Sequence, residues 1–167
     1  MVHDGHHPHH DDRCAHAHDQ AARAPLALAA AEDYCSARGE KMTPLRRTVL
    51  AALYASHRPV SAYDLIEWIA ASGQKPPAPV TIYRTLDFLR AQGFIHRLES
   101  LNAFIACPSA HRPDEPVVFM ICEACGGVDE AAPAPVLTAL KVAADQQGFT
   151  PARSVIEMTG LCSHCRR

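Results

Sequence analysis

Two Cys-x-x-Cys pairs constrain the fold of this chain more than any other feature of its sequence. They are Cys122 with Cys125 and Cys162 with Cys165, and a two-residue spacing lets both thiolates of a pair bind one metal ion from a tight turn. Together the pairs supply the four sulfur ligands of a closed structural Zn²⁺ site. The 36 residues between Cys125 and Cys162 exceed the spacer of an ordinary zinc ribbon and leave room for a strand, a helix and another strand. We therefore expect an αβ unit closed by zinc, rather than two unrelated pairs of buried cysteines.

The length and composition allow one large or two small domains. The chain has 167 residues, of which 48% are hydrophobic, enough to bury a core. Its apolar runs are too short for a membrane-spanning helix, and its His- and Asp-rich N-terminus does not resemble a secretory signal. Seven cysteines, four of them in the two pairs, suit a reducing compartment. We expect a cytoplasmic protein that has no contact with a membrane.

Charge and histidine are distributed unevenly along the chain. Residues 23–97 carry ten Lys and Arg against six Asp and Glu, a net charge of +4, whereas residues 1–22 and 98–167 each have a net charge of −3. A phosphate-binding face in the middle segment would need this positive charge, although a solvated helical surface could also produce it. Residues 1–22 contain seven of the eleven histidines and few large apolar residues. We expect a disordered tail that is either merely solvated or loosely binds Zn²⁺ or Ni²⁺.

Residues 23–107 combine helix signals with a following hairpin. Before Gly93 the apolar residues recur at helical spacing, and after it they alternate with polar residues, as in a strand. Two short strands of this kind flank Leu101-Asn102. Helices followed by a hairpin are typical of a winged helix-turn-helix domain. The predicted helices run from Pro25 to Gly39, from Thr43 to the turn at His57, from Ser61 to Gly73, and from Thr81 to Gly93.

The rest of the chain predicts a hinge and a second domain. Residues 108–116 are polar and proline-rich, as in a hinge. Residues 117–167 contain a strand entering the first cysteine pair, an amphipathic helix around residues 136–143, and a last strand entering the second pair. The predicted fold class is α+β, with an N-terminal winged helix-turn-helix domain followed by a small αβ domain that holds a four-cysteine zinc site.

The helix that begins at Thr81 has an apolar seam and a polar face. Thr81, Tyr83 and Arg84 lie off the seam near the first turn, where a recognition helix meets base edges and phosphates. Arg84 can bind guanine or a phosphate through two hydrogen bonds, and Tyr83 can contact a phosphate or a thymine methyl group. Such a helix alone is often simply amphipathic, but its position before a hairpin favours binding of double-stranded DNA.

Four further residues near the hinge form a candidate metal site. They are His96, Cys107, His111 and Glu130, a set of nitrogen, sulfur and oxygen ligands that suits Zn²⁺. The four residues come from both predicted domains, so a metal bound to all of them would fix the angle between the domains. This arrangement predicts a metal-operated switch.

The motifs taken together resemble the ferric uptake regulator superfamily and, within it, the branch of zinc uptake repressors. The resemblance extends from about Leu26 to Cys165 and leaves the His-rich tail uncovered. The residues that carry it are Thr43-Pro44 with Arg46 or Arg47, Ser61–Leu65, Thr81–Arg84, Leu86–Leu89, Gly93–His96, Glu99-Ser100, Phe119–Gly126 and Gly160–Cys162.

The resemblance implies a homodimeric repressor with two zinc ions per monomer, one structural and one regulatory. Residues 23–107 would then be the DNA-binding domain and residues 117–167 the dimerisation domain. The structural ligands of the family fall on the four paired cysteines. Three regulatory ligands fall on His96, Cys107 and Glu130. The DNA contacts fall on Tyr63 and Arg84, with Tyr83 as a neighbouring candidate.

The chain departs from the family pattern at the fourth regulatory ligand. The relatives place this ligand where the present chain has Glu115, whereas His111 lies four residues earlier. We favour His111 because imidazole suits Zn²⁺ better than a second carboxylate does, while Asp114 and Glu115 remain open. The His-Asp-His cluster of iron-sensing relatives is missing from the hinge. Together with the thiolate of Cys107, this departure favours zinc.

The leading hypothesis is a Zn²⁺-dependent repressor that binds an AT-rich inverted repeat as a homodimer and represses zinc-uptake genes. One alternative is a regulator of the same family that senses iron, manganese or nickel. A zinc-buffering or delivery protein, acting through the tail and the cysteine pairs, is a second. A zinc enzyme is disfavoured, because catalytic sites usually keep an open coordination position and four candidate ligands would fill it.

Overall fold

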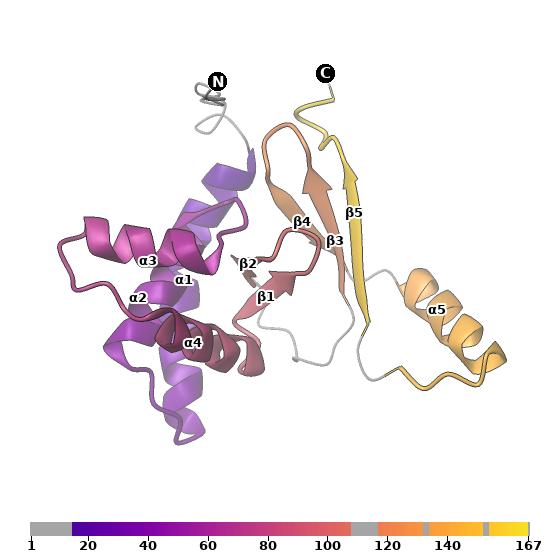
Figure 1. The fold of residues 1–167 in the computed structure, drawn as a ribbon. Coiled ribbons are helices and arrows are strands. Elements are labelled where there is room, and N and C mark those ends of the chain that lie inside the picture. Colours follow the sequence, from indigo (N-terminus) through magenta and orange to yellow (C-terminus); the bar gives the residue numbers. More distant parts are fainter. Residues whose placement is uncertain (1–14, 108–116, 132–133, 152–153, 167) are drawn as a thin grey trace.

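The computed structural model describes residues 15–107, 117–131, 134–151 and 154–166 (Figure 1). The predicted hinge, with His111, Asp114 and Glu115, lies outside these residues. The N-terminal half of the described chain contains four helices and a hairpin, and the C-terminal half contains a three-stranded sheet and one helix. The elements are α1 (Ala15–Ala37), α2 (Pro44–Ala55), α3 (Ala62–Ala71), α4 (Pro79–Ala91), β1 (Ile95–Leu98), β2 (Ala103–Ala106), β3 (Val117–Cys122), β4 (Val128–Ala131), α5 (Ala134–Gln146) and β5 (Val155–Gly160).

Side-chain caps begin α2 and α3 where the sequence predicts them. The Thr43 hydroxyl accepts a hydrogen bond from the backbone N–H of Arg46, and Pro44 occupies the first turn of α2. At α3 the Ser61 hydroxyl accepts from the N–H of Asp64 (3.1 Å), while the Asp64 carboxylate accepts from the N–H of Ser61 (2.9 Å). This reciprocal capping box satisfies two backbone donors that the helix itself leaves unpaired.

Two helices begin earlier than predicted. Helix α1 starts at Ala15 and continues through Pro25, so residues 15–22 are helical and do not belong to a disordered tail. The segment is rich in alanine, which has the highest helix propensity of all residues. Helix α4 starts at Pro79, because a proline at the first helical position needs no hydrogen-bond partner and has the helical φ already.

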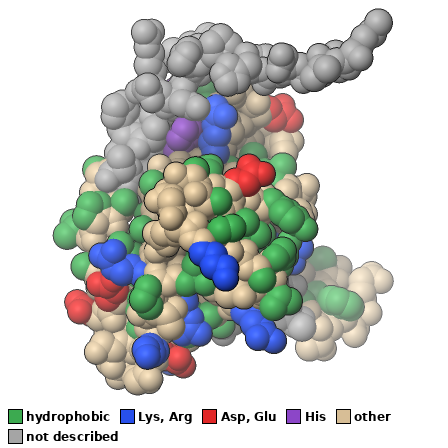
Figure 2. Space-filling model, turned by 60° about the vertical axis from the view of Figure 1, so that its left-hand side comes forward, with side chains coloured by type: hydrophobic (Ala, Val, Ile, Leu, Met, Phe, Trp, Pro, Cys, Tyr) green, Lys and Arg blue, Asp and Glu red, His purple; other side chains and the backbone are tan. Residues whose placement is uncertain are grey.

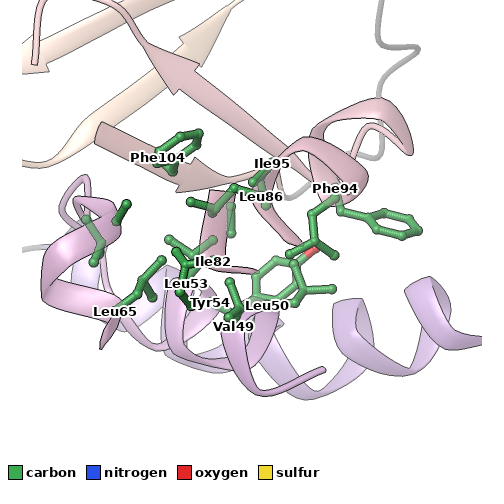
Figure 3. Packing of buried hydrophobic residues seen from close by; sticks show 14 of the residues in the cluster. Val49, Leu50, Leu53, Tyr54, Leu65, Ile82, Leu86, Phe94, Ile95 and Phe104 are labelled. Atoms are coloured by element: carbon green, nitrogen blue, oxygen red, sulfur yellow. The ribbon is translucent and has the colours of Figure 1, made fainter. Parts of the chain in front are cut away.

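One apolar core holds the helices and the hairpin together (Figure 3). Val49, Leu50 and Leu53 of α2 pack with residues of α3, α4, β1 and β2. The Tyr54 hydroxyl donates a hydrogen bond to the backbone carbonyl of Cys107 (3.1 Å), and burial, with Cys107 close by, raises the pKa of Tyr54 to about 12. The end of the hairpin is therefore attached to α2, and the winged helix-turn-helix prediction is confirmed.

The second half of the chain is built on the sheet with strand order β4-β3-β5. Strand β4 pairs with β3 antiparallel, and β5 pairs with β3 parallel. A parallel pair needs a long crossover, and the segment containing α5 supplies it. This crossover accounts for the long spacer between the cysteine pairs. Helix α5 stands beyond β5, away from the other helices, and none of its described residues is buried (Figure 1).

The hairpin packs directly on this sheet. Leu98 of β1 is fully buried in a cluster with Val117, Phe119 and Ile121 of β3. This apolar contact joins the two halves of the chain and sets the position of the hairpin over one face of the sheet.

Candidate metal centres and nucleic-acid interface

The first candidate metal centre is the cluster of the four paired cysteines. One sulfur atom from each of Cys122, Cys125, Cys162 and Cys165 lies within 4.8 Å of the others. Because β3 and β5 are parallel neighbours, the turns that follow them reach the same end of the sheet and bring the pairs together. Gly126 has φ +71°, a left-handed conformation that suits glycine in the tight first turn.

Backbone N–H groups stabilise the sulfur atoms of this cluster. Gly127 donates to Cys125 Sγ and Cys162 donates to Cys122 Sγ, both at 3.4 Å. Burial raises the pKa of the Cys122 thiol, but hydrogen bonds from Cys125, Cys162 and Ala124 outweigh it, and the pKa lies at about 6. A thiol with this pKa is largely a thiolate at neutral pH, the form that binds Zn²⁺.

The Cys165 thiol has the opposite shift. Its pKa is raised to about 11, mainly by a hydrogen bond to Cys162 and further by burial and by Cys122. Sulfur atoms this close share their protons, because four thiolates without a cation would repel one another. The set therefore has the chemistry of a tetrahedral Zn²⁺ site, in which the ion replaces the shared protons.

The second candidate centre is a mixed cluster that joins the two halves of the chain. It consists of His96 on β1, Cys107 after β2 and Glu130 on β4, whose ligand atoms all lie within 4.8 Å of one another. His96 Nε2 is 3.5 Å from Glu130 Oε2, and the Cys107 thiol is 3.9 Å from Glu130 Oε1. The structure thus brings three of the four predicted hinge ligands together, while His111 lies outside the described residues.

Neighbouring elements hold the mixed cluster in place. The backbone N–H of Cys107 donates to the carbonyl of Phe94 (2.8 Å), which attaches the end of the hairpin to its start. The ring of Phe119 lies 5.1 Å from the His96 ring, centroid to centroid, and Phe119 pairs directly with Glu130 across β3 and β4. Nitrogen, sulfur and oxygen ligands in a half-buried site suit Zn²⁺, so the residues fit this ion.

The predicted DNA-contacting residues lie on the outer faces of α3 and α4. Tyr63 is 63% exposed and Tyr83 is 39% exposed, and Thr81 and Arg84 are also exposed. Figure 2, which brings the helical side of the molecule forward, shows Lys and Arg side chains among hydrophobic ones on this face. The first turn of α4 also carries Val80, which is 62% exposed and which the sequence reasoning did not single out.

One residue with several contacts between the two halves was not predicted from the sequence. Glu157 lies in the middle of β5, and its carboxylate accepts hydrogen bonds from the turn of the β1–β2 hairpin. A single charged residue in this strand gives no sign of a partner 57 or 58 residues away.

The described residues give no indication of a membrane-spanning segment, because no helix among them is both long and apolar enough to cross a bilayer.

The chain is similar to known regulators in sequence. Residues 37–159 match the ferric uptake regulator family. The zinc uptake regulation protein of Escherichia coli (strain K12) is 38% identical over 140 residues, which cover 83% of this chain and 80% of that protein.

The fold is similar to solved structures as well. A zinc uptake regulator complexed with zinc and DNA superposes with a TM-score of 0.78 at 36% identity, over 86% of this chain and 95% of that one. The holo form of XcZur has a TM-score of 0.73 at 40% identity, over 83% of this chain and 96% of that one. Its apo form has a TM-score of 0.50 at 39% identity, over 87% of this chain and 99% of that one. At nearly equal identities, the TM-score is higher for the holo form than for the apo form.

Proposed function

The chain belongs to the ferric uptake regulator family, and we propose that it is a zinc-responsive transcriptional repressor that binds operator DNA as a homodimer. It is a regulator rather than an enzyme, like the family it belongs to. The observation that carries the proposal is the mixed cluster, because its ligands come from both halves of the chain. Relatives described as zinc uptake regulators, one of them complexed with zinc and DNA, make zinc the favoured metal.

His96, Cys107 and Glu130 are proposed to hold the regulatory ion, with His111 as the fourth ligand. When bound there, a Zn²⁺ ion would connect the hairpin to the sheet and offset the charge of the partly buried carboxylate and of the thiolate. His96 and Cys107 are fixed to the hairpin, and Glu130 is fixed to β4. The distance between these side chains therefore depends on how the hairpin sits on the sheet, and binding selects the docked arrangement.

The hairpin in turn fixes the direction of α4. Only three residues separate α4 from β1, and the N–H of Phe94 donates to the carbonyl of Leu89 (3.0 Å) across this connection. Gly93 lies there with φ +78°, a helix-ending conformation that suits glycine. A hairpin docked on the sheet thus holds α4 at one orientation, as two α4 helices of a dimer need in order to enter successive major grooves.

Tyr63, Thr81, Tyr83 and Arg84 are proposed to contact the DNA. They are exposed on α3 and on the first turn of α4. Arg84 would bind guanine or a phosphate, while the other three would bind phosphates or pack on thymine methyl groups. The proposed operator is an AT-rich inverted repeat, because a two-fold symmetric dimer reads two symmetric half-sites. The proposed targets are zinc-uptake genes.

Cys122, Cys125, Cys162 and Cys165 are proposed to hold a structural ion that closes the C-terminal half. This gives two zinc ions per monomer, only one of them regulatory. Helix α5 is proposed to lie in the dimer interface, because its apolar side chains Val136, Leu140 and Val142 are exposed in the single chain. The use of four cysteines as zinc ligands supports the proposed cytoplasmic location, because their thiolates need a reducing compartment.

A binding titration tests the proposal. A labelled duplex, selected from a random pool by the zinc-loaded protein, is titrated with protein by fluorescence anisotropy, with added Zn²⁺ or after chelation. We expect tight binding only with Zn²⁺, beginning when the second ion per monomer binds, and weaker activation by Fe²⁺, Mn²⁺ or Ni²⁺. Equal DNA affinity with and without metal would overturn the proposal.

A further inference from the structure

The sheet presents one row of side chains to the hairpin. Glu130 on β4, Phe119 on β3 and Glu157 on β5 are direct partners across the three strands. Laterally paired residues of a sheet point to the same face, and neighbouring strands lie about 4.8 Å apart. The row therefore crosses the whole sheet beneath the hairpin, with a carboxylate at each end and an aromatic ring between them.

The members of this row contact the hairpin at two different places. Glu130 and Phe119 both contact His96 in the mixed cluster. Glu157 instead binds the hairpin turn: Oε1 accepts from the N–H of Glu99 (2.6 Å), and Oε2 accepts from the N–H of Ser100 (3.1 Å) and from the Ser100 hydroxyl. The metal cluster and Glu157 thus attach the same hairpin to the same sheet at two separate points.

The turn is shaped to receive a carboxylate. Arg97 Nε lies 3.3 Å from Glu99 Oε2, and another Arg97 nitrogen donates to Asn102 Oδ1 (3.0 Å). Asn102 has φ +47°, which completes the tight reversal. Arg97 offsets the charge of Glu99, which would otherwise repel Glu157, and successive backbone N–H groups of such a turn form an anion-binding concavity.

These contacts hold the carboxylate of Glu157 in its charged form. Burial raises the pKa of Glu157, but the hydrogen bonds from Ser100 and Glu99 outweigh it and keep the pKa below its ordinary value. Charge-assisted hydrogen bonds are stronger than neutral ones, and three donors converge on this one side chain. The contact needs no metal ion.

We propose that Glu157 is a positioning residue for regulation: it holds the hairpin turn on the sheet and so lowers the zinc concentration at which the protein binds DNA. The proposal rests on the proposed function and deepens it. With the turn already held, the ligands on the hairpin have less freedom to lose when they converge on a regulatory ion. Without this contact, the docked arrangement is less populated and the apparent zinc affinity falls in proportion.

The test compares zinc-dependent DNA binding of Glu157→Ala with that of the wild type. The full-length chain is titrated with buffered Zn²⁺ at a fixed concentration of the labelled duplex. We expect the half-maximal zinc concentration to rise about threefold to tenfold in Glu157→Ala, the range expected for loss of a few exposed hydrogen bonds. Glu157→Gln should fall in between, because its amide oxygen can still accept while its amide nitrogen cannot.

A charge-matched control removes the general electrostatic effect. Glu40→Ala makes the same substitution at an exposed site in the turn after α1. Loss of any negative charge reduces repulsion from DNA phosphates and should slightly strengthen binding. Glu40→Ala should therefore bind as well as the wild type or better, whereas Glu157→Ala should bind less well at intermediate zinc. If Glu40→Ala and Glu157→Ala had the same half-maximal zinc concentration for DNA binding, the proposed role of Glu157 would be overturned.

Ser100→Ala probes the same contact without changing the sheet. It removes the hydroxyl donor but keeps both backbone donors, so we expect a shift of about twofold to threefold. The double variant Ser100→Ala/Glu157→Ala should be no worse than Glu157→Ala alone, because the hydroxyl then has no carboxylate to bind. Additive shifts would contradict the contact. If Glu157→Ala folds poorly, the single variant Ser100→Ala still decides the question, because its expected shift supports the contact and a titration equal to that of the wild type contradicts it.

Hydrogen exchange gives a readout that a general loss of stability would not produce. In Glu157→Ala the amides of Glu99 and Ser100 should exchange faster, while the amides of the α2 core remain protected.

Different outcomes contradict the proposed function and the proposed role of Glu157. If DNA binding by the wild type does not depend on zinc, the proposed function is contradicted. If the wild type depends on zinc and Glu157→Ala has the same half-maximal zinc concentration, only the role of Glu157 is contradicted.

Discussion

The two candidate metal centres differ in which parts of the chain they join. The cysteine cluster takes its four sulfurs from two turns at one end of one sheet, whereas the mixed cluster takes its ligands from the hairpin and from β4. An ion at the first site would stabilise one unit of the fold. An ion at the second would stabilise one arrangement of two units. The same metal can thus be structural at one site and regulatory at the other, since the difference lies in what each set of ligands connects.

The largest expected effect comes from breaking the cysteine cluster. Cys122→Ser should unfold the C-terminal half and abolish dimerisation, because zinc binding contributes on the order of 10 kcal/mol to small zinc domains. Thermal unfolding, zinc content and sedimentation measure this. A stable dimer with wild-type zinc content would show that this cluster is not structural.

Breaking the mixed cluster should leave the fold intact and remove regulation. Cys107→Ser should bind one zinc ion per monomer and remain a folded dimer. Its DNA affinity at saturating Zn²⁺ should fall on the order of 100-fold, the upper range of typical allosteric couplings. Anisotropy and metal analysis on the same sample test both statements. If Cys107→Ser lost its fold as Cys122→Ser does, the distinction between the two centres would be wrong.

Arg84→Ala should weaken DNA binding without affecting either metal centre. We expect a loss of about 1–3 kcal/mol at saturating Zn²⁺, the range for one arginine contact to a base. The half-maximal zinc concentration for filling the regulatory site without DNA should not change. Lys75→Ala, at an exposed site in the loop before α4, is a matched control for loss of a positive charge. A change in zinc affinity in Arg84→Ala would contradict the separation of sensing from DNA contact.

Removal of residues 1–14 should have the smallest effect. The deletion spares α1, which begins at Ala15, and removes five of the seven histidines of residues 1–22. Zinc-dependent DNA binding should stay within about twofold of the wild type, since neither described metal centre uses these residues. Zinc titrations of both proteins provide the measurement. Loss of regulation would favour the alternative of a zinc-buffering or delivery protein.

Local signals in the sequence were enough for most of the fold. Thr43-Pro44 and the capping box at Ser61 begin their helices as predicted, because a cap needs only residues within one turn. The same reasoning missed the starts of α1 and α4. Pro79 predicts a break but is equally compatible with the first position of a helix. Pro25 predicts a helix start, yet it lies inside α1, although an interior proline removes a backbone hydrogen bond.

The sequence by itself determined the two cysteine pairs and their metal-binding chemistry, because each pair lies within one tight turn. The parallel pairing of β3 and β5 brings the two pairs together. Tertiary structure decided the rest. His96 and Glu130 are 34 residues apart in the sequence, and they meet only because the hairpin packs on the sheet through Leu98. Glu157 meets its partners in the hairpin turn for the same reason. A contact set by packing between two units leaves no local pattern, since its distance depends on every residue that holds those units together.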